Sequence, residues 1–230
     1  MNKIKLDNVN IGPDFPPYIV AEMSANHNGE IHNAFKIINS AKDSGANAVK
    51  IQTYKADTIT LDSDLPDFQI NQGLWKGKNL YDLYNSASTP WEWHEELFNY
   101  AKKSNITLFS SPFDTTAVDF LEDLNCPAYK IASFELIDLP LIKYVASTKK
   151  PIIMSTGMAN LDEIKEAVSV CMDVGCKEIA LLHCISAYPA DPSEYNLRTI
   201  SDFIKKFNLI VGLSDHTIGN TTAISSISQG

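Results

Sequence analysis

Short apolar runs that end in polar residues recur along this chain, and helix-like segments separate most successive runs. Each run has the length of a buried strand. Strands that alternate with helices favour a parallel sheet inside an α/β domain. We therefore predict a (β/α)8 TIM barrel, in which the polar strand ends line one shared face. The seven runs cover residues 19–29, 48–54, 108–114, 129–135, 152–158, 181–189 and 211–217.

The segments between these runs carry apolar residues at helical spacing. Residues 34–41 show the i, i+3, i+4, i+7 repeat, and Gly45 follows as a stop signal. Thr89, Pro90 and Glu92 predict a capping box, with Thr89 as the cap and Pro90 as the first helical residue of another helix. Similar apolar stripes predict helices over residues 117–124, 164–171 and 200–207.

Residues 55–88 form the longest stretch without such a pattern, and they hold Trp75, Tyr81 and Tyr84 among polar residues. A connection of this length inside a compact domain is usually functional or disordered. The aromatic residues favour an ordered loop that contacts substrate. Packing over the barrel rim is the alternative that the sequence leaves open.

The two ends of the chain complete the expected architecture. Residues 2–18 predict a short strand or hairpin with a turn near Asp7. The chain ends at Gly230, inside or just after the helix that follows the seventh strand. We therefore expect one domain over residues 1–230, a TIM barrel truncated after its seventh strand and following helix. An open sheet of this kind exposes strand edges, which suggests a fragment of a longer protein.

Composition excludes several classes of function. The formal net charge of -9 argues against nucleic-acid binding, whereas a few lysines in a cleft can still attract a small anion. The four cysteines form no CxxC pair and no zinc spacing, so we expect buried, reduced thiols. Neither a signal sequence nor a membrane-spanning segment is evident, and the cytoplasm is the expected location.

Two lysines stand inside predicted strands, Lys50 and Lys130. A lysine in a barrel interior is costly unless it meets an anion or reacts, although a snorkelling side chain at the barrel end is the alternative. Hydroxyl groups follow several of the same strands. Together these groups predict a cradle for phosphate or carboxylate oxygens. The hydroxyl groups belong to Ser110, Ser111, Ser133, Ser155, Thr156, Ser186 and Ser214.

Three further residues could contribute chemistry. Glu22 ends the first strand, where it could act as a general base, bind sugar hydroxyls or simply pair with a barrel lysine. His216 ends the seventh strand and is either a metal ligand or a structural residue. No second histidine has a spacing that would complete a metal site with it. His183 lies in the middle of a strand and is expected to pack in the barrel wall.

The ordered strand-end motifs resemble those of the sialic acid synthase family, which condenses phosphoenolpyruvate with amino sugars to make nonulosonic acids. The resemblance extends over nearly the whole chain. Further stretches favour the pseudaminic acid branch. Ser186, where sialic acid synthases proper tend to carry asparagine, favours that branch or another bacterial one. The matching strings are IVAEMSANHNG, VKIQTY, FSSPFD, YKIASFE, MSTGMA, LLHCISAYP and GLSDHT.

The resemblance implies a reaction and a role for each residue. Carbon 3 of phosphoenolpyruvate would attack the aldehyde of 2,4-diacetamido-2,4,6-trideoxy-L-altrose, water would add at carbon 2, and phosphate would leave. Glu22, Gln52 and Tyr188 would contact the sugar, and Glu22, Lys50 and Lys130 are the catalytic candidates. Phosphoenolpyruvate would be held by Lys50, Ser111, Lys130, Ser133, Ser155, Ser186 and Ser214.

The resemblance also implies a divalent metal, with manganese preferred over magnesium or cobalt, and His216 as one of its ligands. The family's second metal histidine lies on an eighth strand, which would follow Gly230. A C-terminal antifreeze-like domain, which supports homodimer formation in full-length family members, would also follow it. We therefore expect weak metal binding and little activity from a chain that ends at Gly230.

Three alternatives remain open at this point. A Schiff-base aldolase would use Lys130 as its nucleophile, although such chemistry does not need so many strand-end serines. A non-catalytic fragment would be consistent with the predicted truncation. A synthase of legionaminic or N-acetylneuraminic acid would share the mechanism and differ only in its sugar.

Overall fold

The computed structural model describes residues 3–73 and 75–230 of the chain. These residues divide into two compact units. The N-terminal unit is Ile19–Cys126, and the C-terminal unit combines Met1–Tyr18 with Pro127–Gly230. Within the described residues, no helix combines the length and the apolar character that crossing a membrane requires.

The N-terminal unit is built on three parallel strands in chain order, with helices between them. Its core contains large apolar side chains of both the strands and the helices, among them Met23, Ile38, Ile51 and Leu97. The predicted stripe of α1 is confirmed, because Ala34, Ile38 and Ala41 are its buried residues. The elements are β3 (Val20–Glu22), α1 (Ile31–Asp43), β4 (Ala48–Thr53), α4 (His94–Lys103), β5 (Thr107–Pro112) and α5 (Thr115–Asp123).

The segment after β4 is more regular than the sequence predicted. It contains α2 (Ala56–Ile59), a 3-10 turn (Pro66–Phe68) and α3 (Leu80–Ala87). Asn79 caps α3, because its side chain accepts a 2.7 Å hydrogen bond from the Tyr81 amide. Short helices of one or two turns escape a periodicity search because they carry too few apolar positions. The expectation of an irregular loop was therefore wrong for residues 80–87.

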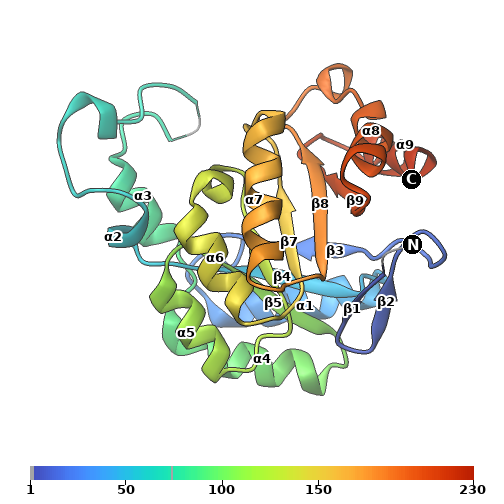
Figure 1. Ribbon diagram of the computed structural model, residues 1–230. Helices are drawn as coiled ribbons and strands as arrows, with labels where there is room; N and C mark the ends of the chain where they lie inside the picture. The colour runs from blue at the N-terminus through green and yellow to red at the C-terminus, as the bar shows by residue number, and fades with distance from the viewer. Residues whose placement is uncertain (1–2, 74) are drawn as a thin grey trace. The chain divides into compact units, whose positions relative to one another are not determined.

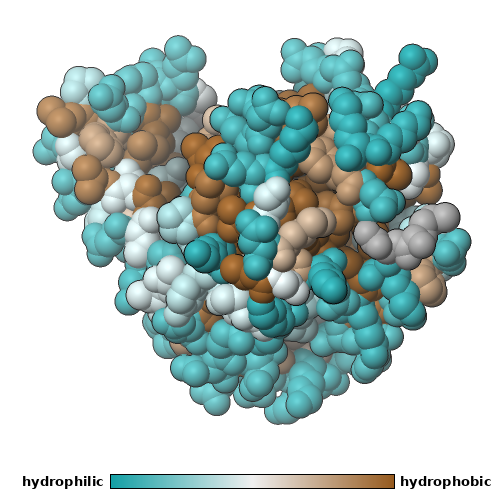
Figure 2. All heavy atoms as spheres, in the orientation of Figure 1, coloured by the Kyte–Doolittle hydropathy of each residue, from teal (hydrophilic) through white to brown (hydrophobic). Residues whose placement is uncertain are grey.

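The same segment exposes apolar side chains. Figure 2 shows hydrophobic surface over the part of the chain that Figure 1 labels α2 and α3, and Leu61, Leu65 and Trp75 are the large exposed apolar residues there. Tyr84 packs against Tyr54 with an edge contact, and Tyr81 donates a 3.0 Å hydrogen bond to Asp57. Contact of this segment with substrate stays a prediction.

The start of α4 also differs from the prediction. Pro90 has an extended backbone (ψ 133) instead of a helical one, and a 3-10 turn (Trp91–Trp93) precedes the helix. The Thr89 hydroxyl is buried and has no hydrogen-bond partner, so it does not cap. The expected capping box is therefore absent from this helix start. The 3-10 turn that contains Trp91 and Trp93 leads directly into α4.

The C-terminal unit holds four parallel strands, again in chain order, and helices α6 and α7 pack together beside them (Figure 1). The N-terminal residues add the expected hairpin, with Asp7 in its turn at φ +51. The elements are β1 (Ile4–Leu6), β2 (Val9–Ile11), β6 (Tyr129–Ile131), α6 (Leu139–Ser147), β7 (Ile152–Ser155), α7 (Leu161–Asp173), β8 (Ile179–Cys184), α8 (Arg198–Phe207), β9 (Ile210–Ser214) and α9 (Thr221–Ser226).

Strands and helices alternate from β3 to α9, and every strand from β3 to β9 runs parallel to its partner within its unit. Seven β/α units in chain order are the repeating pattern of a (β/α)8 TIM barrel. The predicted fold class is confirmed. Each strand therefore delivers its polar C-terminal residues to the βα loops, where the candidate site residues lie.

Candidate functional site

The first group of polar side chains lies at the strand ends of the N-terminal unit. The register of β3 with β4 places Glu22 opposite Lys50, and the two side chains form an ion pair. Lys50 also donates a 3.4 Å hydrogen bond to Ser111 Oγ. The Lys50 side chain is 12% exposed and that of Glu22 is 43% exposed, so the carboxylate is the accessible partner. The predicted pairing of Glu22 with a barrel lysine is confirmed.

Alternation along β4 explains this arrangement. Val49, Ile51 and Thr53 are buried, whereas Lys50 and Gln52 are only half-buried on the opposite face. The neighbouring strand β5 places Ser111 opposite Gln52. A strand that carries two long polar side chains on one face needs polar partners there, and the register supplies them.

Ser24 connects the two residues predicted to contact sugar in this unit, although the sequence analysis did not single it out. Its amide donates a 3.0 Å hydrogen bond to Glu22 Oε1, and its hydroxyl donates a 3.5 Å hydrogen bond to Gln52 Oε1. The Ser24 backbone has φ +46, a conformation that a non-glycine residue adopts rarely. Such backbone conformations cluster at functional sites, but the sequence gives no signal for them.

Ser110 does not belong to this group. Its hydroxyl lies on the opposite face of β5 from Ser111, 2.6 Å from Thr53 Oγ1, and Thr53 Oγ1 lies 2.8 Å from His94 Nε2. The inclusion of Ser110 among the cradle hydroxyls was therefore wrong, because neighbouring strand residues face opposite sides. His94 is fully buried, and burial lowers its pKa to about 4 despite hydrogen bonds to the Pro90 and Trp91 backbone and the charge of Glu92, so the ring is neutral.

The second group of polar side chains lies in the C-terminal unit and centres on Lys130. This side chain is 6% exposed. Its ammonium donates a 2.5 Å hydrogen bond to Ser155 Oγ on the neighbouring strand and a 2.9 Å hydrogen bond to the Ile131 carbonyl. A buried ammonium is stable only with hydrogen-bond acceptors or an anion beside it. The Lys130 ammonium is thus buried within β6 with two oxygen acceptors.

Two loop serines meet beside the next strand. The Gly157 amide donates a 3.2 Å hydrogen bond to Ser133 Oγ, which comes from the loop after β6. Ser186, from the loop after β8, places its hydroxyl over the α-carbon of Gly157. Thr156 turns away from them, because its hydroxyl donates to the Leu182 carbonyl at 3.0 Å. Its inclusion among the cradle hydroxyls was therefore wrong.

His216 is held by its Nδ1 atom, which lies 2.7 Å from the Ile185 carbonyl. This carbonyl accepts a hydrogen bond from the Nδ1–H group, so the neutral ring keeps its lone pair on Nε2. Tyr188 lies over the imidazole with 4.1 Å between ring centroids, and it is 71% exposed. The predicted sugar residue and the predicted metal residue are therefore in contact with each other.

Cys184 lies behind the same histidine, with its Sγ 3.9 Å from His216 Nδ1. Burial opposes ionisation of this thiol, but hydrogen bonds from His216, Ser133 and Ser214 outweigh it and lower the Cys184 pKa. Burial likewise opposes the charged form of His216, and Cys184, the Ile185 carbonyl and nearby Asp215 together raise the His216 pKa. This thiol was expected to be a plain buried cysteine, and its hydrogen bonds were not foreseen.

A divalent metal would need more ligands than His216 alone. Across residues 3–73 and 75–230, no group of three or more histidine, cysteine, aspartate or glutamate side chains is arranged to hold a metal ion. Among the predicted site residues, His216 Nε2 is therefore the candidate ligand for such an ion. His183 is not a second ligand, since its Nε2 is used by the Tyr195 carbonyl within the barrel wall, as expected.

Glu135 is a polar residue of this unit that the sequence analysis overlooked. Its Oε2 atom is buried and has no hydrogen-bond partner. Burial raises the pKa of this carboxyl, with a smaller contribution from Asp138, while its own amide and Lys130 act in the opposite direction. A buried carboxyl near a lysine could have been suspected from its position five residues after Lys130.

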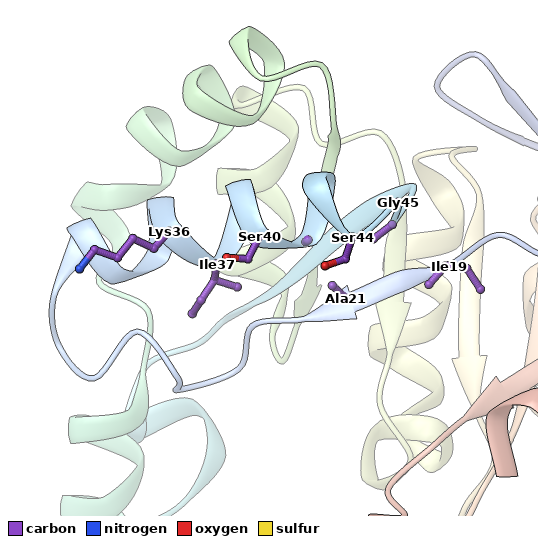
Figure 3. Close-up of a pocket in the computed structure, with 9 residues that line it drawn as sticks. Ile19, Ala21, Lys36, Ile37, Ser40, Ser44 and Gly45 are labelled. Carbon is purple, nitrogen blue, oxygen red and sulfur yellow. The ribbon is translucent and has the colours of Figure 1, made fainter. Parts of the chain in front are cut away.

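The N-terminal unit also contains a surface groove (Figure 3). Its volume is about 490 Å³, and it lies between β3 and α1. Figure 3 shows Ile19, Ala21 and Ile37 along it, while the Lys36 side chain extends away from the other labelled residues. None of the predicted site residues lines the groove. Within its unit β3 pairs with β4 alone, so the groove is an apolar packing surface beside a strand edge.

Comparison with known proteins gives consistent results. The NeuB family matches residues 37–230. The pseudaminic acid synthases of Helicobacter pylori and Campylobacter jejuni are 48% and 42% identical to this chain over 94% and 96% of its length, respectively. The chain spans only 63% and 64% of those two proteins.

Synthases of other nonulosonic acids are also similar to this chain. An N,N'-diacetyllegionaminic acid synthase of Campylobacter jejuni is 39% identical over 92% of the chain. Among solved structures, the N-acetylneuraminic acid synthetase of Leptospira borgpetersenii superposes with a TM-score of 0.89 at 28% sequence identity. The match covers the whole of this chain and 75% of the synthetase chain. The chain therefore belongs to the NeuB family.

Proposed function

We propose that this chain is the barrel part of a pseudaminic acid synthase. The enzyme would condense phosphoenolpyruvate with 2,4-diacetamido-2,4,6-trideoxy-L-altrose to give pseudaminic acid and phosphate. The observation that carries this proposal is the 48% identity to the Helicobacter pylori pseudaminic acid synthase. The activity is a proposal because the chain spans about 63% of that relative. We further propose one synthase domain over residues 1–230, a cytoplasmic location and homodimer formation by the full-length protein.

Phosphoenolpyruvate binding is proposed for the ammonium groups of Lys50 and Lys130 and for the hydroxyls around them. Lys130 with Ser155 supports this assignment, since an ammonium and a hydroxyl 2.5 Å apart can both donate to one anion. Lys50 with Ser111 supports it in the same way in the N-terminal unit. Ser133, Ser186 and Ser214 would donate further hydrogen bonds to phosphate or carboxylate oxygens.

Glu22 is proposed to handle a proton on the sugar side of the reaction. Carbon 3 of phosphoenolpyruvate forms the new bond to the aldehyde carbon, and the aldehyde oxygen gains a proton. Water then adds at carbon 2, and phosphate leaves with its bridging oxygen by cleavage of the C–O bond. Glu22 suits proton transfer because its carboxylate is accessible and held by Lys50 and the Ser24 amide. Gln52 and Tyr188 would hold the sugar.

A divalent metal, manganese in the first place and magnesium or cobalt as alternatives, is proposed as cofactor, with His216 Nε2 as one ligand. Such an ion would polarise the aldehyde and orient the two substrates. The described residues contribute a single imidazole to it, so no step above depends on the metal.

Two other functions are the alternatives to this proposal, and the observations favour only the first of them. Legionaminic acid synthesis is favoured by the 39% identity to a synthase of that sugar, and it would use the same residues. A Schiff-base aldolase would use Lys130, but its ammonium already donates to Ser155 and Ile131. Borohydride trapping of substrate on Lys130 would favour the aldolase.

The deciding experiment measures phosphate release from phosphoenolpyruvate with manganese. It uses this chain and a version extended beyond Gly230 to the length of its relatives. We expect release with the altro sugar and not with N-acetylmannosamine or the sugar precursor of legionaminic acid. Release with one of the other sugars would replace the proposed substrate. No release with any sugar from the extended protein, despite bound phosphoenolpyruvate, would favour a non-catalytic role.

A further inference from the structure

We propose that Gly157 is a positioning residue of the anion site, because its missing side chain lets the Ser133 and Ser186 hydroxyls come close to its α-carbon, where both can donate to the anion. This inference deepens the proposed function and rests on it. It concerns the C-terminal unit alone, and it assigns a role to a residue that carries no functional group.

The backbone conformation does not require glycine at position 157. Seven other glycines have φ between +73 and +136, where an L side chain is strained, and Gly157 is not among them. Glycine at 157 must therefore serve another purpose. Close approach of neighbouring groups is the usual remaining reason for a glycine.

A side chain at position 157 would crowd the neighbouring polar groups. A Cβ atom at 157 would overlap with Ser186 Oγ, lie 2.9 Å from Ser133 Oγ and lie 3.2 Å from Cys184 Sγ. All three are polar ends of side chains from the loop after β6 and from the end of β8 and the loop after it. Gly157 is thus the point on which two predicted substrate-binding serines converge.

Two hydrogen bonds hold the Ser133 side chain. Its Oγ accepts a 3.2 Å hydrogen bond from the Gly157 amide and shares a hydrogen bond with Cys184. These two contacts fix the hydroxyl against the glycine, and a methyl group at 157 would displace it. The displaced groups are hydroxyls that turn about χ1 into another rotamer, so the fold can absorb the substitution while the site cannot.

The chemistry of the neighbourhood points to an oxyanion. Lys130 lies three residues before Ser133, and Ser155 lies two residues before Gly157, so the same two strand ends supply an ammonium and a hydroxyl. Hydroxyls and an ammonium supplied by neighbouring strand ends suit a phosphate or carboxylate oxygen. Both groups occur in phosphoenolpyruvate, and they can be told apart with separate probes.

The test compares Gly157→Ala with Gly212→Ala. Gly212 lies in β9 of the same unit, also lacks a positive φ, and a Cβ there would lie 3.0 Å from a Leu182 side-chain carbon. It therefore reports packing strain without a contact to the serines. Calorimetry measures the binding of phosphoenolpyruvate, inorganic phosphate and pyruvate, and thermal unfolding measures stability.

We expect Gly157→Ala to weaken phosphoenolpyruvate binding about tenfold or more, the loss expected for a hydrogen bond to a charged group, with a melting temperature no lower than that of Gly212→Ala. Weaker phosphate binding would show that these two hydroxyls contact the phosphate, and weaker pyruvate binding would show that they contact the carboxylate. In a Ser133→Ala, Ser186→Ala background, Gly157→Ala should change affinity little further, since it acts through these hydroxyls.

Two results would overturn the inference. One is unchanged affinity for every anion in Gly157→Ala, and the other is an equal loss in Gly212→Ala. The outcome is separable from the proposed function. If the protein binds phosphate or pyruvate but not phosphoenolpyruvate, the proposed function fails and the Gly157 comparison is made with the anion that binds. If it binds none of the three, both proposals are wrong.

Discussion

The Lys130 ammonium lies 2.5 Å from the Ser155 hydroxyl, in an environment where the lysine is 6% exposed. Strands β6 and β7 bring the two residues together, since Lys130 pairs in register with Ile153, two residues before Ser155. A cation in such a place has little water to neutralise it, so an incoming anion gains more from it than from a surface lysine.

Lys130→Met is therefore expected to abolish measurable binding of phosphoenolpyruvate, a loss of at least about 100-fold, without destabilising the fold. The methionine fills a similar volume and removes a charge whose burial is costly. Isothermal calorimetry and urea unfolding check the two parts. Ser155→Ala serves as the milder control, with a loss of about tenfold for one hydroxyl. Anion binding that survives Lys130→Met would contradict the role of this cation.

Glu22→Gln should reduce turnover by a factor of about 100 or more and leave stability almost unchanged. General acid–base groups contribute factors of this size, whereas a part-exposed ion pair contributes at most about 1 kcal/mol to folding. Steady-state phosphate release measures turnover, and Glu95→Gln on the exposed surface of α4 is the control in the same unit. An effect on KM alone would show that Glu22 only binds the sugar.

The fold could be predicted from sequence because its signal is repeated. Each β/α unit shows an apolar run, a polar strand end and a helical stripe, so an error in one unit leaves the class intact. Local details lack such redundancy. The capping box at Thr89 satisfied the sequence rule, but Trp91 and Trp93 formed a 3-10 turn that moved the helix start to His94.

The site was predictable only as far as strand alternation could be followed. Lys50, Gln52 and Ser111 come together at neighbouring strand ends, because β4 and β5 pair in register. Ser110 and Thr156 were wrong because hydroxyls at strand ends look alike in a sequence, whichever face they take. Gly157 and Ser24 escaped because their roles depend on space and on backbone conformation, which a residue name does not reveal.

The buried imidazole of His94 predicts a loss of stability in acid. Its pKa is about 4 in the folded protein and about 6.5 in an unfolded chain. The unfolded state therefore binds the proton first, and stability falls as pH drops from about 6.5 towards 4. The contribution of this residue between pH 7 and pH 5 is about 2 kcal/mol.

Urea unfolding at pH 7 and pH 5 measures this difference. His94→Asn should reduce the pH dependence by most of that amount, even though it lowers stability at pH 7 through the lost contact with Thr53. The exposed His32→Asn is the matched control and should leave the slope unchanged. A slope that His94→Asn leaves intact would show that another group, such as buried His27 with its lowered pKa, causes the acid sensitivity.

Glu135 should lower stability as pH rises, whereas His94 lowers it as pH falls. Burial raises its pKa in the folded state, so the folded protein prefers the protonated carboxyl. Above the unfolded value of about 4.5 the unfolded chain loses the proton first, and stability falls as pH rises through the window up to the raised pKa. Its Oε2 atom has no hydrogen-bond partner to offset the charge.

Glu135→Gln removes this charge and keeps the shape of the side chain. We therefore expect the variant to be more stable than the wild type at pH 7.5, with a smaller gain at pH 4.5. Denaturant unfolding at both pH values checks this, and Glu166→Gln on the exposed surface of α7 is the control. A loss of stability at pH 7.5 would mean that the ionised carboxylate is compensated in the folded protein, with nearby Lys130 as the first candidate for the compensating charge.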